Sequence, residues 1–208
     1  MTRYSFAMAG RRFADFLLFG VTATELGILF LLTPTFTAVD WVYVLQHLMV
    51  LGIALTRPAP KVQDYSLGAS IAVAVAYAYP YAQVIVLRWS AGYVIASTTG
   101  LVLVTLAAAL SLLSLLTMGK AFGVRPALRQ LITKGPYKLV RHPMYLSYLL
   151  ADVGYNLQES NVATVLLVLI GWTSLFWRIQ AEERLLAVDA GWRSYATLTR
   201  YRVFPGVW

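Results

Sequence analysis

The feature that most constrains this chain is a series of six apolar segments separated by short polar stretches. They cover roughly residues 13–32, 39–56, 66–87, 91–117, 144–158 and 161–180. A helix needs about 20 largely apolar residues, within a range of about 17–25, to cross the hydrocarbon core of a bilayer. All segments but the fifth meet this requirement. Only 12% of the residues are charged, whereas a soluble domain has about 25%. We expect an all-α, polytopic integral membrane protein with about six transmembrane helices and a cytosolic C-terminal helix and tail.

The fifth segment is shorter and more polar than the others. Its sequence, MYLSYLLADVGYNLQ, includes Asp152, Gly154 and Asn156. Polar and ionisable side chains inside a membrane usually face protein or a water-filled cavity, because lipid does not solvate them. We therefore expect this segment to face protein or a cavity. A tight turn at Glu-Ser-Asn is expected to join it to the sixth segment in a helical hairpin.

The basic residues are divided unevenly between the two sides of the predicted bundle. With the N-terminus inside, 16 of the 17 Lys and Arg residues fall on the inner side, and only Arg88 falls outside. Lys and Arg gather in the cytoplasmic loops of membrane proteins. The net charge of +8 therefore indicates topology and not nucleic-acid binding. We expect both termini to be cytoplasmic, in the inner membrane if the chain is bacterial.

Residues that bind metals are scarce. The chain has no cysteine and two histidines, His47 and His142, so disulfides, thiolate metal sites and a cysteine nucleophile are excluded. We expect no metal. Glu25 and His47 lie in apolar segments, where ionisable residues are costly and often functional. Two interpretations stay open for them: they pair with each other, or they shape a pocket.

Three polar elements follow the fourth segment, and the predicted topology brings them to one membrane surface. They are MGKAFGVRP (118–126), LITKGPYKLVRHPMY (131–145) and RIQAEERLL (178–186). A hairpin brings its two ends together, so Arg141 is expected near Glu182. Carboxylates, cations and the aromatic faces of Tyr137 and Tyr145 suit a ligand of mixed charge. S-adenosylmethionine fits, because aromatic faces favour cations such as its sulfonium, but composition alone does not distinguish it from other such ligands.

Residues 118–208 resemble the isoprenylcysteine carboxyl methyltransferase family, which is related to the membrane phospholipid methyltransferases. The resemblance rests on GKAFGV, GPYKLVRHPMY, RIQAEE and the ending YRVFPGVW. It implies a small helical membrane enzyme with S-adenosylmethionine in a cytoplasm-facing pocket and a lipid-like or prenylated acceptor that enters from the bilayer. We accordingly divide the chain into N-terminal transmembrane helices, residues 1–117, and a methyltransferase core, residues 118–208.

The resemblance also implies individual site residues. The substrate-side arginine of the family corresponds to Arg178, one helical turn before Glu182 on the same helix face. Glu183 and Arg202 join Arg178 as catalytic candidates. Arg129 stands where eukaryotic members have a histidine, and Ser147 stands near a position where the family usually has glycine. The implied cofactor contacts are Arg129, Gln130, Leu131, Ile132, Tyr137, Arg141, His142, Pro143, Met144, Tyr145 and Glu182.

Methyl transfer from a sulfonium is an in-line displacement, which requires alignment of donor and acceptor and exclusion of water. A carboxylate acceptor, which we favour, is already ionised, and Arg178 or Arg202 would orient it. An amine acceptor needs a base, for which Glu183 is the nearest candidate. We expect the acceptor to enter from lipid through a gap beside Ser147 and Tyr148.

Two other functions compete with methyl transfer. A membrane reductase of the sterol-reductase type, using NADPH, ends in an aromatic-Arg-x-x-Pro tail similar to YRVFPGVW. This chain, however, is short and carries the Arg-x-x-x-Glu-Glu form. Six helices also permit a transporter or sensor, but the polar elements gather on one face and no pair of broken helices crosses the midplane. We therefore predict a methyltransferase.

Overall fold

A computed structural model of the chain describes residues 19–28, 30–31, 38–89, 93–94, 97–123 and 125–207, and these residues are mostly helical. A helix covers residues 19–28. The next helices are α2 (Ala38–Thr56), α3 (Leu67–Trp89), α4 (Thr98–Met118), α5 (Pro143–Gln158), α6 (Val162–Leu186) and α7 (Trp192–Leu198). Short 3-10 helices cover Gly119–Ala121 (η1) and Gly135–Lys138 (η2). Two-residue strands are β1 (Val62–Gln63), β2 (Tyr93–Val94), β3 (Ala127–Leu128) and β4 (Glu159–Ser160).

The helical nature of the apolar segments is confirmed, but six membrane spans are not. Within the described part of the chain, two helices are long and apolar enough to cross a membrane by length and composition: Thr98–Ala121 and Val162–Leu186. Asp40–Thr56 is a shorter apolar helix. The α5 helix has 16 residues, below the length that a span requires, as the sequence indicated. Residues 1–18, with three of the predicted inner-side arginines, lie outside the described part.

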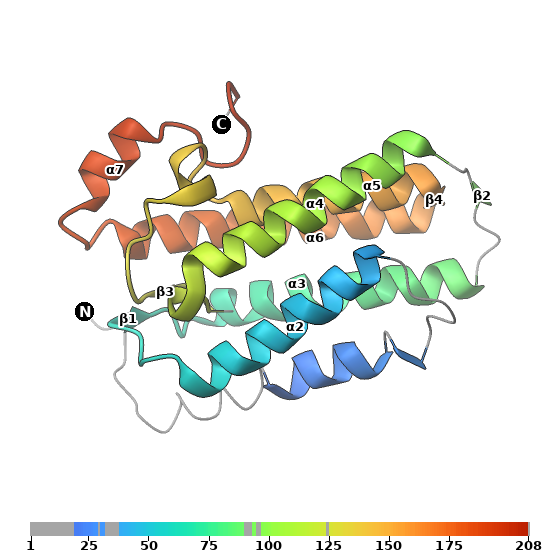
Figure 1. Cartoon of the computed structure of the whole chain (residues 1–208), viewed down its shortest axis with the longest axis horizontal. Helices are drawn as coiled ribbons and strands as arrows, with labels where there is room; N and C mark the ends of the chain where they lie inside the picture. The colour runs from blue at the N-terminus through green and yellow to red at the C-terminus, as the bar shows by residue number, and fades with distance from the viewer. Residues whose placement is uncertain are drawn as a thin grey trace.

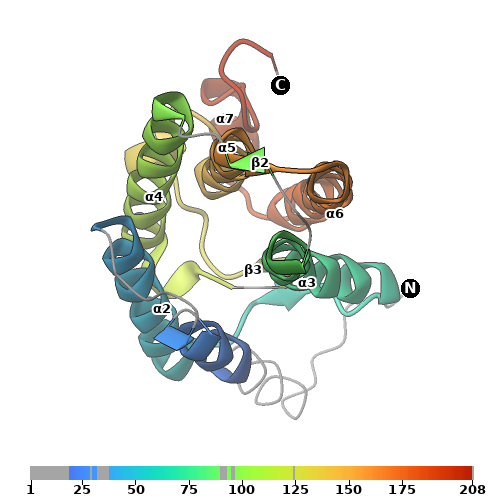
Figure 2. The ribbon, with the colours of Figure 1, turned by 90° about the vertical axis from the view of Figure 1, so that its right-hand side faces the viewer.

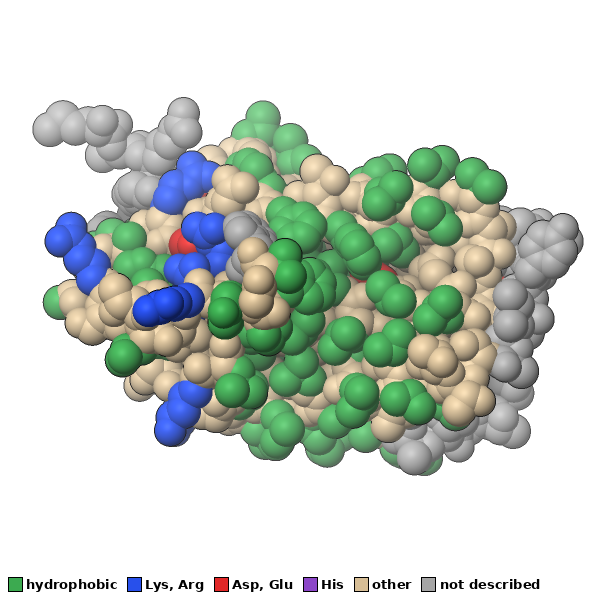
Figure 3. Space-filling view, turned by 90° about the horizontal axis from the view of Figure 1, so that it is seen from above, with side chains coloured by type: hydrophobic (Ala, Val, Ile, Leu, Met, Phe, Trp, Pro, Cys, Tyr) green, Lys and Arg blue, Asp and Glu red, His purple; other side chains and the backbone are tan. Residues whose placement is uncertain are grey.

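The loops between the helices separate into two ends of the bundle (Figure 1). Antiparallel pairing of β2 with β4 lies at one end. Pairing of β1 with β3 lies at the other, together with η2 and α7. We call this second end, residues 57–66, 119–142 and 187–207, the basic end. Lys and Arg side chains gather there, and hydrophobic side chains cover much of the remaining face in Figure 3. Its cytoplasmic orientation stays a prediction.

Close packing of α4 against α5 positions the polar elements of the basic end. A Cβ atom on Gly100 would lie 2.7 Å from the carbonyl oxygen of Gly154, and a Cβ on Gly154 would lie 2.8 Å from that of Gly100. Only glycine at both positions permits this approach, which is typical of helix pairs in membranes. The two helices lie side by side (Figure 2), so the start of α5 stays close to the end of α4.

A buried polar cluster joins α3, α5 and α6. Asp152 is 7% exposed, and its Oδ2 atom accepts hydrogen bonds from the Tyr79 hydroxyl at 3.1 Å and from Trp172 Nε1 at 2.9 Å. The prediction that Asp152 faces protein is confirmed. A second contact joins α2 to α4, because Gln46 bonds to the Ala108 carbonyl and to Ser111. These bonds satisfy polar groups that lipid would leave without partners.

Glu25 and His47 pair with each other, which is one of the two interpretations that the sequence left open. The distance from His47 Nε2 to Glu25 Oε2 is 3.1 Å. The other ring nitrogen, Nδ1, lies 2.7 Å from the Tyr43 carbonyl. Because a carbonyl only accepts, Nδ1 carries a proton, and the short Nε2 contact requires a second proton between the ring and the carboxylate. The pair is therefore electrically neutral as a unit.

Candidate active site

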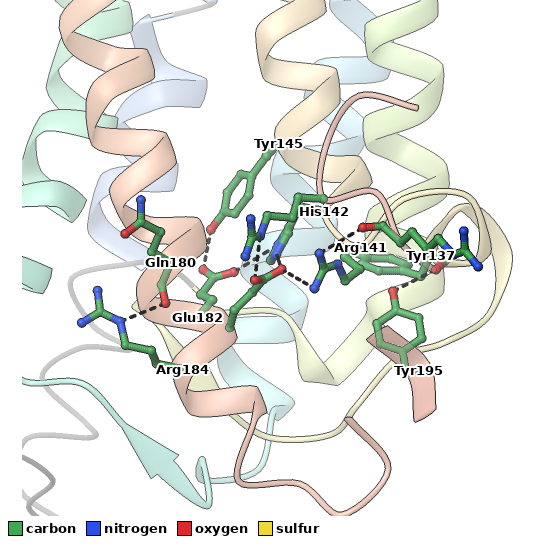
Figure 4. A network of polar contacts seen from close by, with 11 residues as sticks. Tyr137, Arg141, His142, Tyr145, Gln180, Glu182, Arg184 and Tyr195 are labelled. Atoms are coloured by element: carbon green, nitrogen blue, oxygen red, sulfur yellow. Dashed lines mark hydrogen bonds and ion pairs between the residues drawn. The ribbon is translucent and has the colours of Figure 1, made fainter. Parts of the chain in front are cut away.

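Two local features of the chain bring its signature motif to the end of α6. Gly135 has φ +58°, and a Cβ there would lie 2.8 Å from Thr117 Oγ1. Glycine is therefore needed both for the backbone conformation and for the close approach of η2 to α4. Pro143 occupies the first turn of α5, where the missing amide hydrogen costs nothing. As a result, Arg141 and His142 face the last turns of α6 (Figure 4).

Glu183 is held by three cationic or potentially cationic side chains. Its Oε1 atom lies 3.0 Å from Arg141 Nη1 and 3.4 Å from His142 Nε2. Its Oε2 atom accepts a 2.8 Å hydrogen bond from Arg202 Nε. The Glu183 side chain is only 11% exposed, so these partners balance a largely buried charge. Glu183 thus ties the end of α6 to the start of α5 and to the C-terminal tail.

Glu182 faces a different set of groups. It accepts a hydrogen bond from the Tyr145 hydroxyl, and it lies 3.8 Å from His142 Nδ1 and 3.9 Å from Arg178 Nη2. The Arg178 guanidinium lies 5.3 Å from the centre of the Tyr145 ring. The His142 ring also stacks on the Tyr145 ring, with 5.5 Å between the two ring centroids. A carboxylate, a buried cation and the aromatic faces of His142 and Tyr145 therefore converge. The sequence predicted this combination of groups, with Tyr137 and Tyr145 as the aromatic faces.

The C-terminal tail runs along the motif and bonds to its backbone. The amide of Arg141 donates to the Tyr201 carbonyl at 2.9 Å, and the amide of His142 donates to the Arg202 carbonyl at 2.8 Å. Val203, which is fully buried, packs with Tyr145 in an apolar cluster between α5 and α6. The tail is therefore part of the site architecture and not a free extension.

Tyr137 offers an unused hydrogen-bonding group. The residue is 6% exposed, and among the described residues its buried hydroxyl has no hydrogen-bond partner. Burial, followed by the nearby Glu182 charge, raises the pKa of the Tyr137 phenol, so the group is a neutral O–H donor at physiological pH. Buried polar groups almost always have partners. A ligand atom that accepts a hydrogen bond would satisfy this one.

The predicted cofactor residues at 129–132 lie in the segment between β3 and η2. A Cβ on Gly123 would lie 2.2 Å from Arg129 Nη1, so the glycine of the GKAFGV element makes room for the guanidinium. Leu131 reaches the turn between α6 and α7, where it lies 3.5 Å from the Cβ position of Gly191. Gln130 is exposed and Ile132 is partly buried. The predicted ligand role of residues 129–132 stays a prediction.

Two residues of the motif are packing residues in this structure. Pro143 is fully buried. Met144 belongs to an apolar cluster with Leu115 and Phe122. Their predicted cofactor contacts would have to involve backbone atoms or the edge of this cluster, and they stay predictions.

The expected entry path beside Ser147 and Tyr148 stays a prediction, and Ser147 itself is a packing residue in this structure. Ser147 is 1% exposed, and its hydroxyl donates to the Met144 carbonyl at 2.6 Å. It lies seven residues before Gly154, two helical turns away on the same face of α5, so it faces α4 and not lipid. Tyr148 is partly buried, and its ring lies 6.1 Å from the Tyr145 ring. The small side chain of Ser147 instead permits close helix packing.

Sequence reasoning missed two aromatic residues of α7 that support the motif. The Arg141 guanidinium lies 5.7 Å from the centre of the Trp192 ring, and the Tyr195 hydroxyl donates to the Tyr137 carbonyl at 2.8 Å. Burial raises the pKa of Tyr195 to about 12, which keeps this donor protonated. Their spacing of three residues on one helix face was the available signal.

Burial also affects the pKa of Arg141, which lies against Trp192. Desolvation lowers the pKa of Arg141, and the opposing attraction of Glu183 does not fully offset it. An arginine titrates so far above neutral pH that the side chain stays charged. Arg141 therefore acts as a permanent positive charge between Glu183 and Trp192.

No group of three or more potential metal ligands occurs in the part of the chain that the structure describes.

Comparison with known proteins gives the family. A family model described as phospholipid methyltransferase matches residues 87–188, about half of the chain. A comparison with curated proteins finds no match. The matched region includes α4, α5, α6, the motif and both glutamates. It agrees with the resemblance that the motifs carry, and with the two long apolar helices it supports a membrane methyltransferase. The chain therefore carries a domain of the phospholipid methyltransferase family, a group of membrane methyltransferases to which the isoprenylcysteine carboxyl methyltransferases are related.

Proposed function

We propose that the chain uses S-adenosylmethionine to methylate a carboxylate oxygen of a lipid-like acceptor. One observation carries this proposal: a buried cation, Arg178, and a carboxylate, Glu182, flank the ring of Tyr145 at the start of the signature motif. A positively charged methyl donor suits the carboxylate and the aromatic face. An anionic acceptor suits the buried guanidinium, because planar guanidinium groups bind carboxylates well.

The cofactor fits the groups that the chain presents. When bound, S-adenosylmethionine supplies an electrophilic methyl group on a positively charged sulfur. Glu182 and the rings of His142 and Tyr145 favour positive charge nearby. The Tyr137 hydroxyl, which has no partner among the described residues, would donate a hydrogen bond to an acceptor atom of the cofactor. These residues would bind and orient the donor without a change in their own protonation.

The ion pairs of Glu183 indicate which kind of atom accepts the methyl group. Transfer to an amine requires a base that removes a proton. Glu183 is held by Arg141, His142 and Arg202, and ion pairs of this kind make a carboxylate a weak base. Transfer to a carboxylate requires no base, so this acceptor agrees best with the geometry. In this proposal Arg178 orients the acceptor, while Glu183 and Arg202 hold the tail and motif in place.

The family match also supports an acceptor of lipid character, because the family is described by its action on phospholipids. It does not favour the alternative of an NADPH-dependent reductase. The division at residue 117 also stays a proposal, since the pairing of β1 with β3 joins its two sides.

The proposal is tested by methyl transfer with radiolabelled S-adenosylmethionine in membranes that contain the full-length chain. We expect label in the lipid fraction, and we expect mild alkali to release it as methanol, because methyl esters hydrolyse and N-methyl groups do not. Glu182→Gln should abolish most of the incorporation, whereas Glu159→Gln, at the opposite end of the bundle, should not. Label that is stable to alkali would indicate that the acceptor is an amine and not a carboxylate. Absence of any Glu182-dependent label would refute the methyltransferase proposal.

A further inference from the structure

The C-terminal segment combines a structural role with exposed apolar side chains. Leu198 is 85% exposed, Val207 is 82% exposed and Tyr201 is 39% exposed. Nevertheless Val203, between them in the chain, is fully buried against α5 and α6. The backbone of this segment is therefore fixed in place while its large apolar side chains point outward. Apolar side chains that gather on a surface mark a site of interaction.

A second loop joins this surface. The Thr199 hydroxyl donates to the Lys138 carbonyl at 3.4 Å, so the segments that carry Leu198 and Leu139, which is 72% exposed, are adjacent. Lys138 and Arg200 are also exposed. We call the combined surface the tail patch; it consists of Lys138, Leu139, Leu198, Arg200, Tyr201 and Val207. Its charged members are both cations.

The tail patch lies where a bilayer surface would meet the bundle. The C-terminal tail projects sideways from the bundle next to the start of α5 (Figures 1 and 2). In Figure 3, this face shows Lys and Arg side chains at the basic end and hydrophobic side chains beyond them. Exposed leucines of α4, among them Leu113 and Leu116, lie in the last turns of a candidate span that ends at the basic end.

We propose that the tail patch docks into the anionic headgroup layer of the bilayer that holds the helices. Leucine and valine side chains next to Lys and Arg are typical of segments that lie at a membrane interface. The two cations complement anionic lipids, which attract basic segments beside a membrane span. Continuity with the lipid-facing helices favours the same bilayer over a protein partner, since the patch needs no further component to be covered.

Docking of the tail patch acts on the candidate active site through the backbone. Residues 200–202 of the tail contact the motif directly: Arg141 donates to the carbonyls of Arg200 and Tyr201, and His142 donates to the carbonyl of Arg202. A lipid surface that holds the tail therefore holds the motif in the arrangement that the structure shows. This step rests on the proposed function, and it makes anionic lipid an activator of cofactor binding.

Docking is tested with a fluorescent label at a single cysteine, since the natural chain has none. The full-length chain with Leu198→Cys is labelled and reconstituted in vesicles of phosphatidylcholine, with or without one quarter phosphatidylglycerol. We expect lipid-borne quenchers to quench the label, and more strongly with phosphatidylglycerol. Ala190→Cys, in the exposed turn between α6 and α7, is the control that aqueous quenchers should reach. Equal access of aqueous quenchers to both labels would overturn the docking proposal.

The coupling is tested by calorimetric titration with S-adenosylhomocysteine in the same two membranes. We expect several-fold tighter binding with phosphatidylglycerol, and we expect the double variant Leu198→Ser, Arg200→Gln to lose this difference while it retains binding. Equal affinity of the natural chain in both membranes would overturn the coupling. Absence of binding in both membranes would count against the proposed cofactor, whereas the quenching experiment would still decide whether the patch docks.

Discussion

Two polar clusters of this protein differ in how completely their polar groups are hydrogen-bonded within the cluster. In the middle of the bundle, Asp152 accepts from Tyr79 and Trp172, and the cluster is made of short hydrogen bonds between helices. At the basic end, Glu182 accepts a hydrogen bond from Tyr145 but lies 3.8 Å from His142 and 3.9 Å from Arg178. The nearby Tyr137 hydroxyl has no partner among the described residues. The first arrangement stabilises the fold, and the second has polar groups left over for the ligand that we propose.

The largest expected effect is on the central cluster. Asp152→Ala removes the acceptor of two buried donors, each of which costs about 1–3 kcal/mol when it is left without a partner. We therefore expect the free energy of unfolding to fall by about 2–5 kcal/mol. Thermal unfolding in detergent measures this effect. Asp152→Asn retains an acceptor oxygen and should recover most of the loss. Unchanged stability of Asp152→Ala would show that this cluster does not hold the helices.

The second-largest effect is expected on ligand affinity, which should depend on Glu182 and not on Asp152. Glu182→Gln removes a charge from the basic end, where charge-assisted contacts contribute about 1.5–3 kcal/mol. We expect the affinity for S-adenosylhomocysteine to fall by about 10–100-fold, with little change in thermal stability. Folded Asp152→Asn should bind with natural affinity. A Glu182→Gln variant that unfolds easily but binds normally would reverse the roles assigned to the two clusters.

A smaller effect is expected at Tyr137. Tyr137→Phe removes the hydroxyl that has no partner among the described residues, so stability should not fall, whereas a lost neutral hydrogen bond to a ligand costs about 0.5–1.5 kcal/mol. We expect about 2–10-fold weaker binding of S-adenosylhomocysteine. Calorimetry and thermal unfolding of the same preparation give both values. Loss of stability with natural affinity would indicate a structural hydroxyl instead.

The smallest effect is expected where the tail meets Glu183. The Arg202 side chain is 34% exposed, and Glu183 retains Arg141 when Arg202 is replaced. Partly exposed ion pairs contribute about 0.2–1 kcal/mol, so Arg202→Gln should weaken cofactor affinity by no more than about fivefold. Its effect should be smaller than that of Arg141→Gln, which removes the more buried partner. The reverse order in matched titrations would assign Arg202 a direct role in the reaction.

The sequence predicted the helices well because each apolar segment ends at polar residues or at a capping residue. Asn161, for example, closes a capping box with Thr164 at the start of α6. It also predicted that the motif meets Glu182, since a hairpin leaves few other arrangements. The pairing of Glu25 with His47 was one of two readings that it allowed.

Other features depend on contacts between distant segments and were not predictable from local patterns. The approach of Gly100 to Gly154 accompanies the burial of Ser147, which local patterns could not show. The partners of Asp152 come from α3 and α6. The insertion of Val203 gives the tail its position, although the surrounding sequence is polar. The number of spans stays a prediction, because two of the apolar helices in the described part of the chain meet the length and composition of a span.

Cofactor binding at the basic end is the central element of the proposed function. Titration of the purified, full-length protein with S-adenosylhomocysteine and, separately, with NADPH tests this claim. We predict saturable binding of S-adenosylhomocysteine at one site, which Glu182→Gln weakens and Glu159→Gln does not, and no binding of NADPH. Binding of NADPH that depends on Glu182, or S-adenosylhomocysteine binding that is absent or independent of Glu182, would contradict the account.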